Sequence, residues 1–280
     1  MGEERDPVGP IEAFRRFAVL HGFARSWLWA ATAEASWLPG LVGAALIATV
    51  AFLLLWIPQR AWLAPFVALP ALLLQLVLTF PLTDNHFFLE LYAVVLLALA
   101  GPRDEAASLA LTGLRSLAVI VLFVTGLQKV LYGQYFDGQF LAFMVSQSER
   151  FALAFAPLVS EAQHAALRAL DPMRTGQGPF RADGWLLPAA SNAVWILELA
   201  LPGLIVWTRS RAFAVAVALA LVALIQLGAR EIGFALFFGN LLLLFTANGN
   251  RLALIPSALV YAYGLVAVTT GTLPFDPGWL

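Results

Sequence analysis

Lys129 is the residue whose chemistry stands out most in this sequence. It is the only lysine among sixteen basic residues, and it lies at the end of an apolar run typical of a membrane-spanning helix. Two interpretations of this amine stay open. It is either a desolvated, uncharged base that faces a cavity, or it reaches the lipid head groups and does nothing further. Because side chains three and four apart share a helix face, a small and polar stripe is expected around it: Thr125, Gly126, Lys129, Tyr132 and Gly133.

A histidine and a glutamate lie together at the start of an earlier apolar segment. His86 and Glu90 are four residues apart, and Glu90 lies about one turn inside the segment, where its charge must be neutralised or paired. Such a pair can hold or relay a proton. Alternatively, Asp84 or Asn85 merely caps the helix, and Glu90 is a hydrogen-bonded structural carboxyl.

Glu198 is the deepest carboxylate of the chain, near the middle of a later apolar segment and four residues before Pro202. At this depth a carboxylate is expected to be protonated, or paired with a cation, rather than free. We therefore expect its helix face to meet Lys129 or an arginine. The alternative is a structural carboxyl that is hydrogen-bonded at a proline kink.

The elements that position these residues are expected to be membrane helices. Hydrophobic residues make up 61% of the 280 and charged residues 12%, against about half and about a quarter in soluble domains. The sequence therefore predicts an all-α polytopic bundle of about eight transmembrane helices with amphipathic interfacial helices. A tight reversal is expected near residue 230. The expected spans are approximately residues 38–56, 61–82, 87–100, 107–131, 185–207, 212–227, 232–245 and 252–270.

The chain is expected to form one domain over residues 1–280, because no internal repeat is evident. Residues 1–36 carry apolar side chains at three- and four-residue steps, which predicts an amphipathic helix on the membrane surface or one packed on the protein's own loops. Residues 134–183 are the longest stretch outside the spans and should form an extramembrane or interfacial loop region with a turn at Asp137 and Gly138. Four arginines in this stretch either bind an anionic group or form a solvated face: Arg150, Arg168, Arg174 and Arg181.

Composition disfavours several kinds of site and partner. The chain has no cysteine, and its three histidines are widely separated, so no metal centre is expected. The formal net charge of -1 does not supply the basic face that nucleic-acid binding requires. The partners that remain are membrane lipid and other proteins.

Three short motifs resemble the vitamin K-dependent gamma-carboxylase family and its bacterial transmembrane relatives, the HTTM proteins. They are NH-x-x-L entering a span, G-x-x-K ending a span and followed by an aromatic residue and a glycine, and E-x-x-x-P within a later span. The resemblance follows the chain in order from about residue 15 to about residue 255. The matching residues are Asn85, His86 and Leu89 for the first motif, Gly126, Lys129, Tyr135 and Gly138 for the second, and Glu198 and Pro202 for the third.

The resemblance implies an integral protein of the bacterial inner membrane that uses a reduced naphthoquinone of the vitamin K type. Lys129 would be the base that deprotonates the quinol, and His86 is a second catalytic candidate. Reaction of the quinol with dioxygen would then drive carboxylation of a secreted or precursor peptide, or of another acceptor. The candidates for binding substrate or quinone are Asn85, Glu90, Gly126, Tyr132, Tyr135, Glu198 and Gln226.

Two features depart from the pattern of that family. Relatives commonly have a histidine in the span after E-x-x-x-P, where this chain has Gln226, which cannot titrate. The chain also ends soon after its last expected span, so no large soluble region for engaging a substrate is expected. The alternatives to an enzyme are a non-catalytic membrane partner for maturation, export or immunity of a secreted peptide, and a quinone-binding subunit of an electron-transfer assembly.

Overall fold

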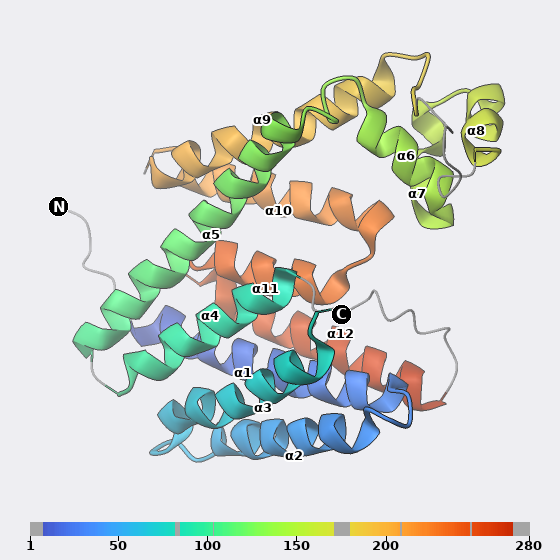
Figure 1. Cartoon of the computed structure of the whole chain (residues 1–280). Helices are drawn as coiled ribbons and strands as arrows, with labels where there is room; N and C mark the ends of the chain where they lie inside the picture. The colour runs from blue at the N-terminus through green and yellow to red at the C-terminus, as the bar shows by residue number, and fades with distance from the viewer. Residues whose placement is uncertain are drawn as a thin grey trace. The chain divides into compact units, whose positions relative to one another are not determined.

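The computed structural model describes residues 8–81, 85–102, 104–170, 180–207, 209–246 and 248–270. Within these residues every regular element is a helix and no strand is present, which confirms the predicted all-α class (Figure 1). Contacts group the chain into two compact units, which are treated separately below. The first unit comprises Met1–Ala118 and Ile232–Leu280, and the second unit comprises Val119–Glu231. The predicted single domain stays a prediction.

Five of the helices in the described part of the chain are long and apolar enough to cross a membrane. Three further predicted spans correspond to shorter apolar helices, α2 (Leu38–Leu54), α4 (Asn85–Ala100) and α11 (Ile232–Leu243). At 1.5 Å per residue the longest of these three is about 26 Å, which is less than the roughly 30 Å of a hydrocarbon core. The predicted count of eight is therefore not confirmed. The five long candidates are Ala61–Thr79, Glu105–Tyr132, Leu186–Val206, Arg211–Ala229 and Gly249–Thr270.

Helix α1 (Val8–Thr32) is the central element of the first unit. It contacts α2, α4, α11, α3 (Ala64–Thr79) and α12 (Gly249–Thr270). Consecutive residues such as Phe17, Ala18 and Val19 are all buried, so the buried surface is wider than one narrow stripe. One face, which includes Arg16, stays partly exposed. Of the two arrangements expected for this segment, packing against the rest of the protein is the one found, and the contacts are with helices of its own unit (Figure 1).

Small side chains let α2 and α3 pack closely in the first unit. Ala44 and Ala48 of α2 and Ala71 of α3 form one buried cluster. Alanines at a helix contact allow the two backbones to approach, which increases the dispersion contacts between them when lipid provides no hydrophobic driving force. Helix α3 also contacts α1, and it contributes the buried Gln75 to the first unit.

The second unit contains the last part of α5 (Asp104–Tyr132), together with α9 (Leu186–Val206) and α10 (Arg211–Ala229). The stretch expected to be loops contains short helices instead, because its apolar residues recur at helical spacing and share a core with the start of α9. Buried core members include Leu141, Val145, Leu167 and Leu187. The short helices are α6 (Gln139–Gln147), α7 (Glu149–Phe155) and α8 (Glu161–Arg168), with a 3₁₀ turn at Ala156–Leu158.

The turn predicted at Asp137 and Gly138 is confirmed by backbone geometry, and a helix ends where the reversal near residue 230 was predicted. Gly138 has a left-handed φ of 77° at the start of α6, a conformation that glycine adopts without steric cost. Helix α10 ends at Ala229, and Arg230 is left-handed with a φ of 56° before α11 begins at Ile232. Hence one helix ends and another begins at the predicted position, and the reversal of direction stays a prediction because the two helices belong to different units.

Candidate functional site

Lys129 and Glu198 form a close ion pair within the second unit. Lys129 lies in the last turn of α5, and Glu198 lies in the middle of α9. The Nζ atom of Lys129 is 2.9 Å from Oε1 and 2.8 Å from Oε2 of Glu198, so both carboxylate oxygens contact one amine. Of the partners expected for Glu198, the lysine is therefore the one found. The lysine side chain is 18% exposed and the glutamate side chain 7%, so the pair is more accessible from the lysine.

Gly126 allows the two helices to come this close. A Cβ atom at Gly126 would lie 3.0 Å from the Cβ of Glu198 and 3.0 Å from the Cγ of Leu199, which is tighter than ordinary van der Waals contact. Because Gly126 precedes Lys129 by three residues, it lies on the same helix face. The glycine and the lysine of G-x-x-K thus act together, since one admits α9 and the other binds its carboxylate.

An aromatic residue follows the ion pair at the end of α5. Gly133, with a left-handed φ of 71°, ends the helix, and the ring centroid of Tyr135 then lies 5.3 Å from Lys129 Nζ. Tyr135 stacks on Phe140 with a centroid separation of 4.7 Å. Burial raises the pKa of the Tyr135 hydroxyl above its usual range, and the nearby Glu198 carboxylate raises this pKa further. Tyr135 is therefore a neutral phenol beside the ion pair.

The turn after α5 is fixed onto the beginning of α9. A Cβ atom at Gly138 would lie 3.1 Å from the backbone of Pro188, and Asn192 Nδ2 donates to the Phe136 carbonyl at 2.8 Å. The Trp195 indole donates to Asn192 Oδ1 at 2.9 Å. These contacts hold the turn and α9 in one arrangement, so the position of Tyr135 is set by the same helix that carries Glu198.

The other two candidates in the second unit are less closely tied to the ion pair. Tyr132 is 75% exposed, so this member of the predicted polar stripe points outward. Gln226 on α10 has a buried amide whose nitrogen and oxygen lack hydrogen-bond partners among the described residues. A binding role for either residue stays a prediction.

Glu90 belongs to a different cluster, inside the first unit. Its Oε1 atom is 3.0 Å from His21 Nε2, and its Oε2 atom is 2.6 Å from Arg25 Nη1. All three side chains are 2% exposed or less. The prediction that this carboxylate needs a partner is confirmed. The candidate predicted from the sequence was His86, whereas His21 and Arg25 were not predicted.

His86 and Asn85 are at the start of α4 in the first unit. The His86 imidazole stacks on the ring of Phe234 with a centroid separation of 3.9 Å, and Asn85 is exposed. The predicted cavity shared by Lys129, Asn85 and His86 stays a prediction. Asp84, the other predicted cap, lies outside the described residues.

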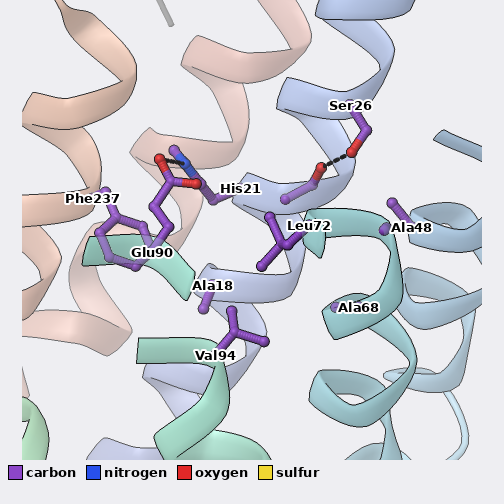
Figure 2. A pocket seen from close by; sticks show the side chains of 11 residues that line it. Ala18, His21, Ser26, Ala48, Ala68, Leu72, Glu90, Val94 and Phe237 are labelled. Carbon is purple, nitrogen blue, oxygen red and sulfur yellow. Dashed lines mark hydrogen bonds and ion pairs between the residues drawn. The ribbon is translucent and has the colours of Figure 1, made fainter. Parts of the chain in front are cut away.

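A small cavity lies beside Glu90 and His21 (Figure 2). Its free volume is about 10 Å³, which is roughly what one water molecule needs and far too little for a quinone ring. The wall is mainly apolar and includes Leu72 and Val94, while Ser26 adds a third polar side chain. This cavity therefore offers space for a water-sized molecule only.

The arginines between residues 134 and 183 differ in their surroundings. Arg168 donates through Nη1 to the carbonyl oxygens of Val145 and Ser146 at 3.3 and 3.0 Å. These hydrogen bonds join the end of α8 to α6. Arg174 lies outside the described residues. Binding of an anionic group by this stretch stays a prediction.

The partners of Glu90 that were not predicted from the sequence lie on α1. His21 and Arg25 are four residues apart, and both interrupt an otherwise apolar helix face. That spacing was the available signal, because a histidine and an arginine on one buried face imply a carboxylate on a neighbouring element. Among the described residues, no three histidine, cysteine, aspartate or glutamate side chains are placed to hold a metal ion. Comparison of the chain with models of known families, with curated proteins and with solved structures finds no match.

Proposed function

We propose that the protein is an integral membrane protein of the bacterial inner membrane whose Lys129–Glu198 pair exchanges a proton with the hydroxyl of a reduced naphthoquinone of the vitamin K type. The eight apolar helices would be its crossings, with the three shorter ones accommodated by local thinning of the bilayer. Five helices of spanning length support the membrane assignment. The observation that carries the chemistry is the contact of both Glu198 oxygens with Lys129 Nζ.

The ion pair has two protonation states that differ only in the position of one proton. In one state an ammonium faces a carboxylate, and in the other a neutral amine faces a carboxylic acid. Removal from water disfavours the charged state, and the proton belongs to the pair rather than to either group. Glu198 would therefore hold the proton that leaves Lys129, and the uncharged amine would accept a proton from a phenol-like hydroxyl.

The surroundings of the pair suit a flat aromatic head group. Tyr135 and Phe140 are stacked beside Lys129, and Phe136 meets Trp195 edge-on with centroids 5.6 Å apart. Aromatic faces favour a further planar ring in stacked or edge-on geometry. When bound, the reduced quinone would supply the oxygen-dependent chemistry that drives carboxylation of a peptide or another acceptor.

A second function is also compatible with the ion pair, because Lys129 and Glu198 neutralise each other without a bound substrate. Each charge of the pair has its opposite within 3 Å, as expected for a contact that only joins α5 to α9. The protein would then be a non-catalytic membrane partner in the maturation, export or immunity of a secreted peptide. In that case the charge of Lys129 would matter, and its ability to lose a proton would not.

Replacing Lys129 by arginine separates the two functions. A guanidinium keeps a bidentate contact with a carboxylate but does not deprotonate in proteins. If the pair is a base, Lys129→Arg should lower formation of oxygenated quinone by purified protein in vesicles about 10²- to 10⁴-fold, while the fold is retained. Quinone turnover in Lys129→Arg equal to that of the unaltered protein would exclude Lys129 as the base.

Because Lys129 is the only lysine, labelling with [¹⁵N]lysine gives a single Nζ signal, which needs no assignment. The acid–base proposal expects this signal to move from ammonium toward amine when Glu198 is replaced by glutamine and the lipid environment is kept. Arg211→Lys, on the first turn of α10, adds a reference lysine at a helix end. An Nζ signal that matches the reference ammonium in every variant would favour the structural ion pair.

A further inference from the structure

Helices α9 and α10 form an antiparallel pair that gives a scale for depth in the membrane. They lie side by side and are joined by a short connection (Figure 1). With 21 and 19 residues, they are about 32 and 29 Å long, close to the roughly 30 Å of a hydrocarbon core. Trp185 precedes α9 and Trp207 follows it, and both are exposed, as expected of tryptophans at the two surfaces of a membrane.

Charged residues bracket α10 in the same way. Arg211 is its first residue and Arg230 follows its last, and the residues between them carry no charge. Because the two helices run in opposite directions from a short connection, residues equally far from it lie at about the same depth. Arg230 is therefore nearly level with the start of α9, and both indicate a membrane surface at this end of the pair.

Helix α5 ends well short of that surface. Its Gly126 lies against Glu198, which is twelve residues, or about 18 Å, beyond the start of α9. After the end of α5, the Phe136 carbonyl accepts from Asn192, which is still six residues, or about 9 Å, beyond the start of α9. The non-helical residues 133–136 join these two levels, so they lie at the depth of the hydrocarbon.

This non-helical segment is exposed on the surface of the second unit. Gln134 and the neighbouring Asp137 are exposed, and Phe136 is 47% exposed. Non-helical backbone at the depth of the hydrocarbon is tolerated only where it is buried in protein or meets water. An exposed carboxylate disfavours burial against another protein, because charged residues are depleted at the centre of such interfaces. Water is therefore the neighbour that suits this segment.

The deep end of the segment lies beside the ion pair. The ring of Tyr135 is 5.3 Å from Lys129 Nζ, and the lysine side chain keeps 18% of its surface exposed. The other end of the segment leads to Gly138, which lies against Pro188 in the first turn of α9. The segment thus runs from the ion pair to the membrane surface on the side of α6, α7 and α8.

We propose that residues 133–137 line a water-filled entrance into the membrane from the side of α6, α7 and α8, and that it brings water and small water-soluble molecules to Lys129 from that face only. The inference rests on the membrane placement in the proposed function and not on the quinone. The outward side chains of α10 at the same depth, such as Leu224, meet lipid instead.

Single cysteines test the entrance, because the chain has no cysteine of its own. Each variant in sealed lipid vesicles is treated with a charged, membrane-impermeant methanethiosulfonate, and the rate of modification is measured by mass spectrometry. Gln134→Cys reports on the segment. Ala162→Cys, exposed on α8, is the reference for water. Leu224→Cys is the reference for lipid, because this side chain is 62% exposed and is nearly as far from the connection as Asn192.

The rates should divide the three positions into two groups. Only the thiolate reacts, and apolar surroundings raise the pKa of a thiol, so each pKa unit slows the reaction about tenfold. We expect Gln134→Cys to react at a rate close to that of Ala162→Cys, and Leu224→Cys to react at least about tenfold more slowly. In vesicles of uniform orientation, Gln134→Cys should be modified from the same side as Ala162→Cys.

The possible failures are distinguishable. Modification of Gln134→Cys as slow as that of Leu224→Cys, or only from the side opposite to Ala162→Cys, overturns the entrance and leaves the membrane placement intact. Fast modification of Leu224→Cys overturns the membrane placement and the entrance with it. If Gln134→Cys does not fold, Phe136→Cys is subject to the same expectations and the same refutations.

Discussion

Gly126→Ala is the substitution for which the structure gives the sharpest expectation. An alanine within a helix is favoured over glycine by about 1 kcal/mol, so on helix propensity alone the change should stabilise α5. The new methyl group, however, would lie 3.0 Å from Glu198 Cβ and 3.0 Å from Leu199 Cγ. The Leu199 side chain can rotate away, but the Cβ of Glu198 is fixed by the backbone of α9, so the helices must separate by a few tenths of an ångström.

The magnitude follows from comparison with a second glycine of the same unit. Inserting a methyl group into a close-packed contact costs about 1–3 kcal/mol. Gly203 lies within α9 and has no atom within 4 Å of an added Cβ, so Gly203→Ala should gain the propensity of about 1 kcal/mol without that cost. The propensity cancels between the two variants. Gly126→Ala should therefore be less stable than Gly203→Ala by about 1–3 kcal/mol.

Reversible unfolding in mixed micelles measures this difference, with helix content followed by circular dichroism. The Nζ signal of [¹⁵N]lysine-labelled protein supplies an independent readout, because separation of α5 from α9 lengthens the Lys129–Glu198 contact. We expect this signal to shift in Gly126→Ala and not in Gly203→Ala. Equal stabilisation by the two alanines, with an unchanged Nζ signal, would refute the close approach of α9 to Gly126.

Three further outcomes are expected. Glu90→Leu should destabilise the protein by about 3–5 kcal/mol, because it removes one partner of a buried ion pair, the carboxylate that lies 2.6 Å from Arg25 Nη1. Adding Arg25→Met should recover much of this loss in the unfolding free energy, and additive losses would contradict the pairing. Gly138→Ala should lower the free energy of unfolding by about 1–2 kcal/mol, since its φ of 77° is left-handed and Pro188 leaves no room for a methyl group. An unfolding midpoint equal to that of the unaltered protein would exclude this strain. Folding raises the pKa of the Tyr135 hydroxyl, so the unfolded chain releases this proton at a lower pH than the folded protein does. The free energy of unfolding should therefore fall as the pH rises above about 10, and it should fall less in Tyr135→Phe. Identical alkaline stability curves for the two proteins would count against a buried phenol.

The sequence alone determined the helical class and the apolar segments, because local periodicity and hydrophobicity are properties of neighbouring residues. It also identified Lys129 and Glu198, since a charged side chain in an apolar run is conspicuous without knowledge of the fold. From the sequence, Glu198 could pair with Lys129 or with an arginine. It pairs with Lys129 because α9 packs closely against α5 at Gly126.

Only the tertiary structure decided which side chains meet across helices. Glu90 has a histidine four residues before it in the sequence, yet its carboxylate forms close ion pairs with His21 and Arg25, because α1 packs against α4. For the same reason most of α1 is buried against other helices, although its residues also allowed a helix on the membrane surface. The physical reason is that a helix face is set by spacing within the sequence, whereas the partner of that face is set by packing between elements far apart in the chain.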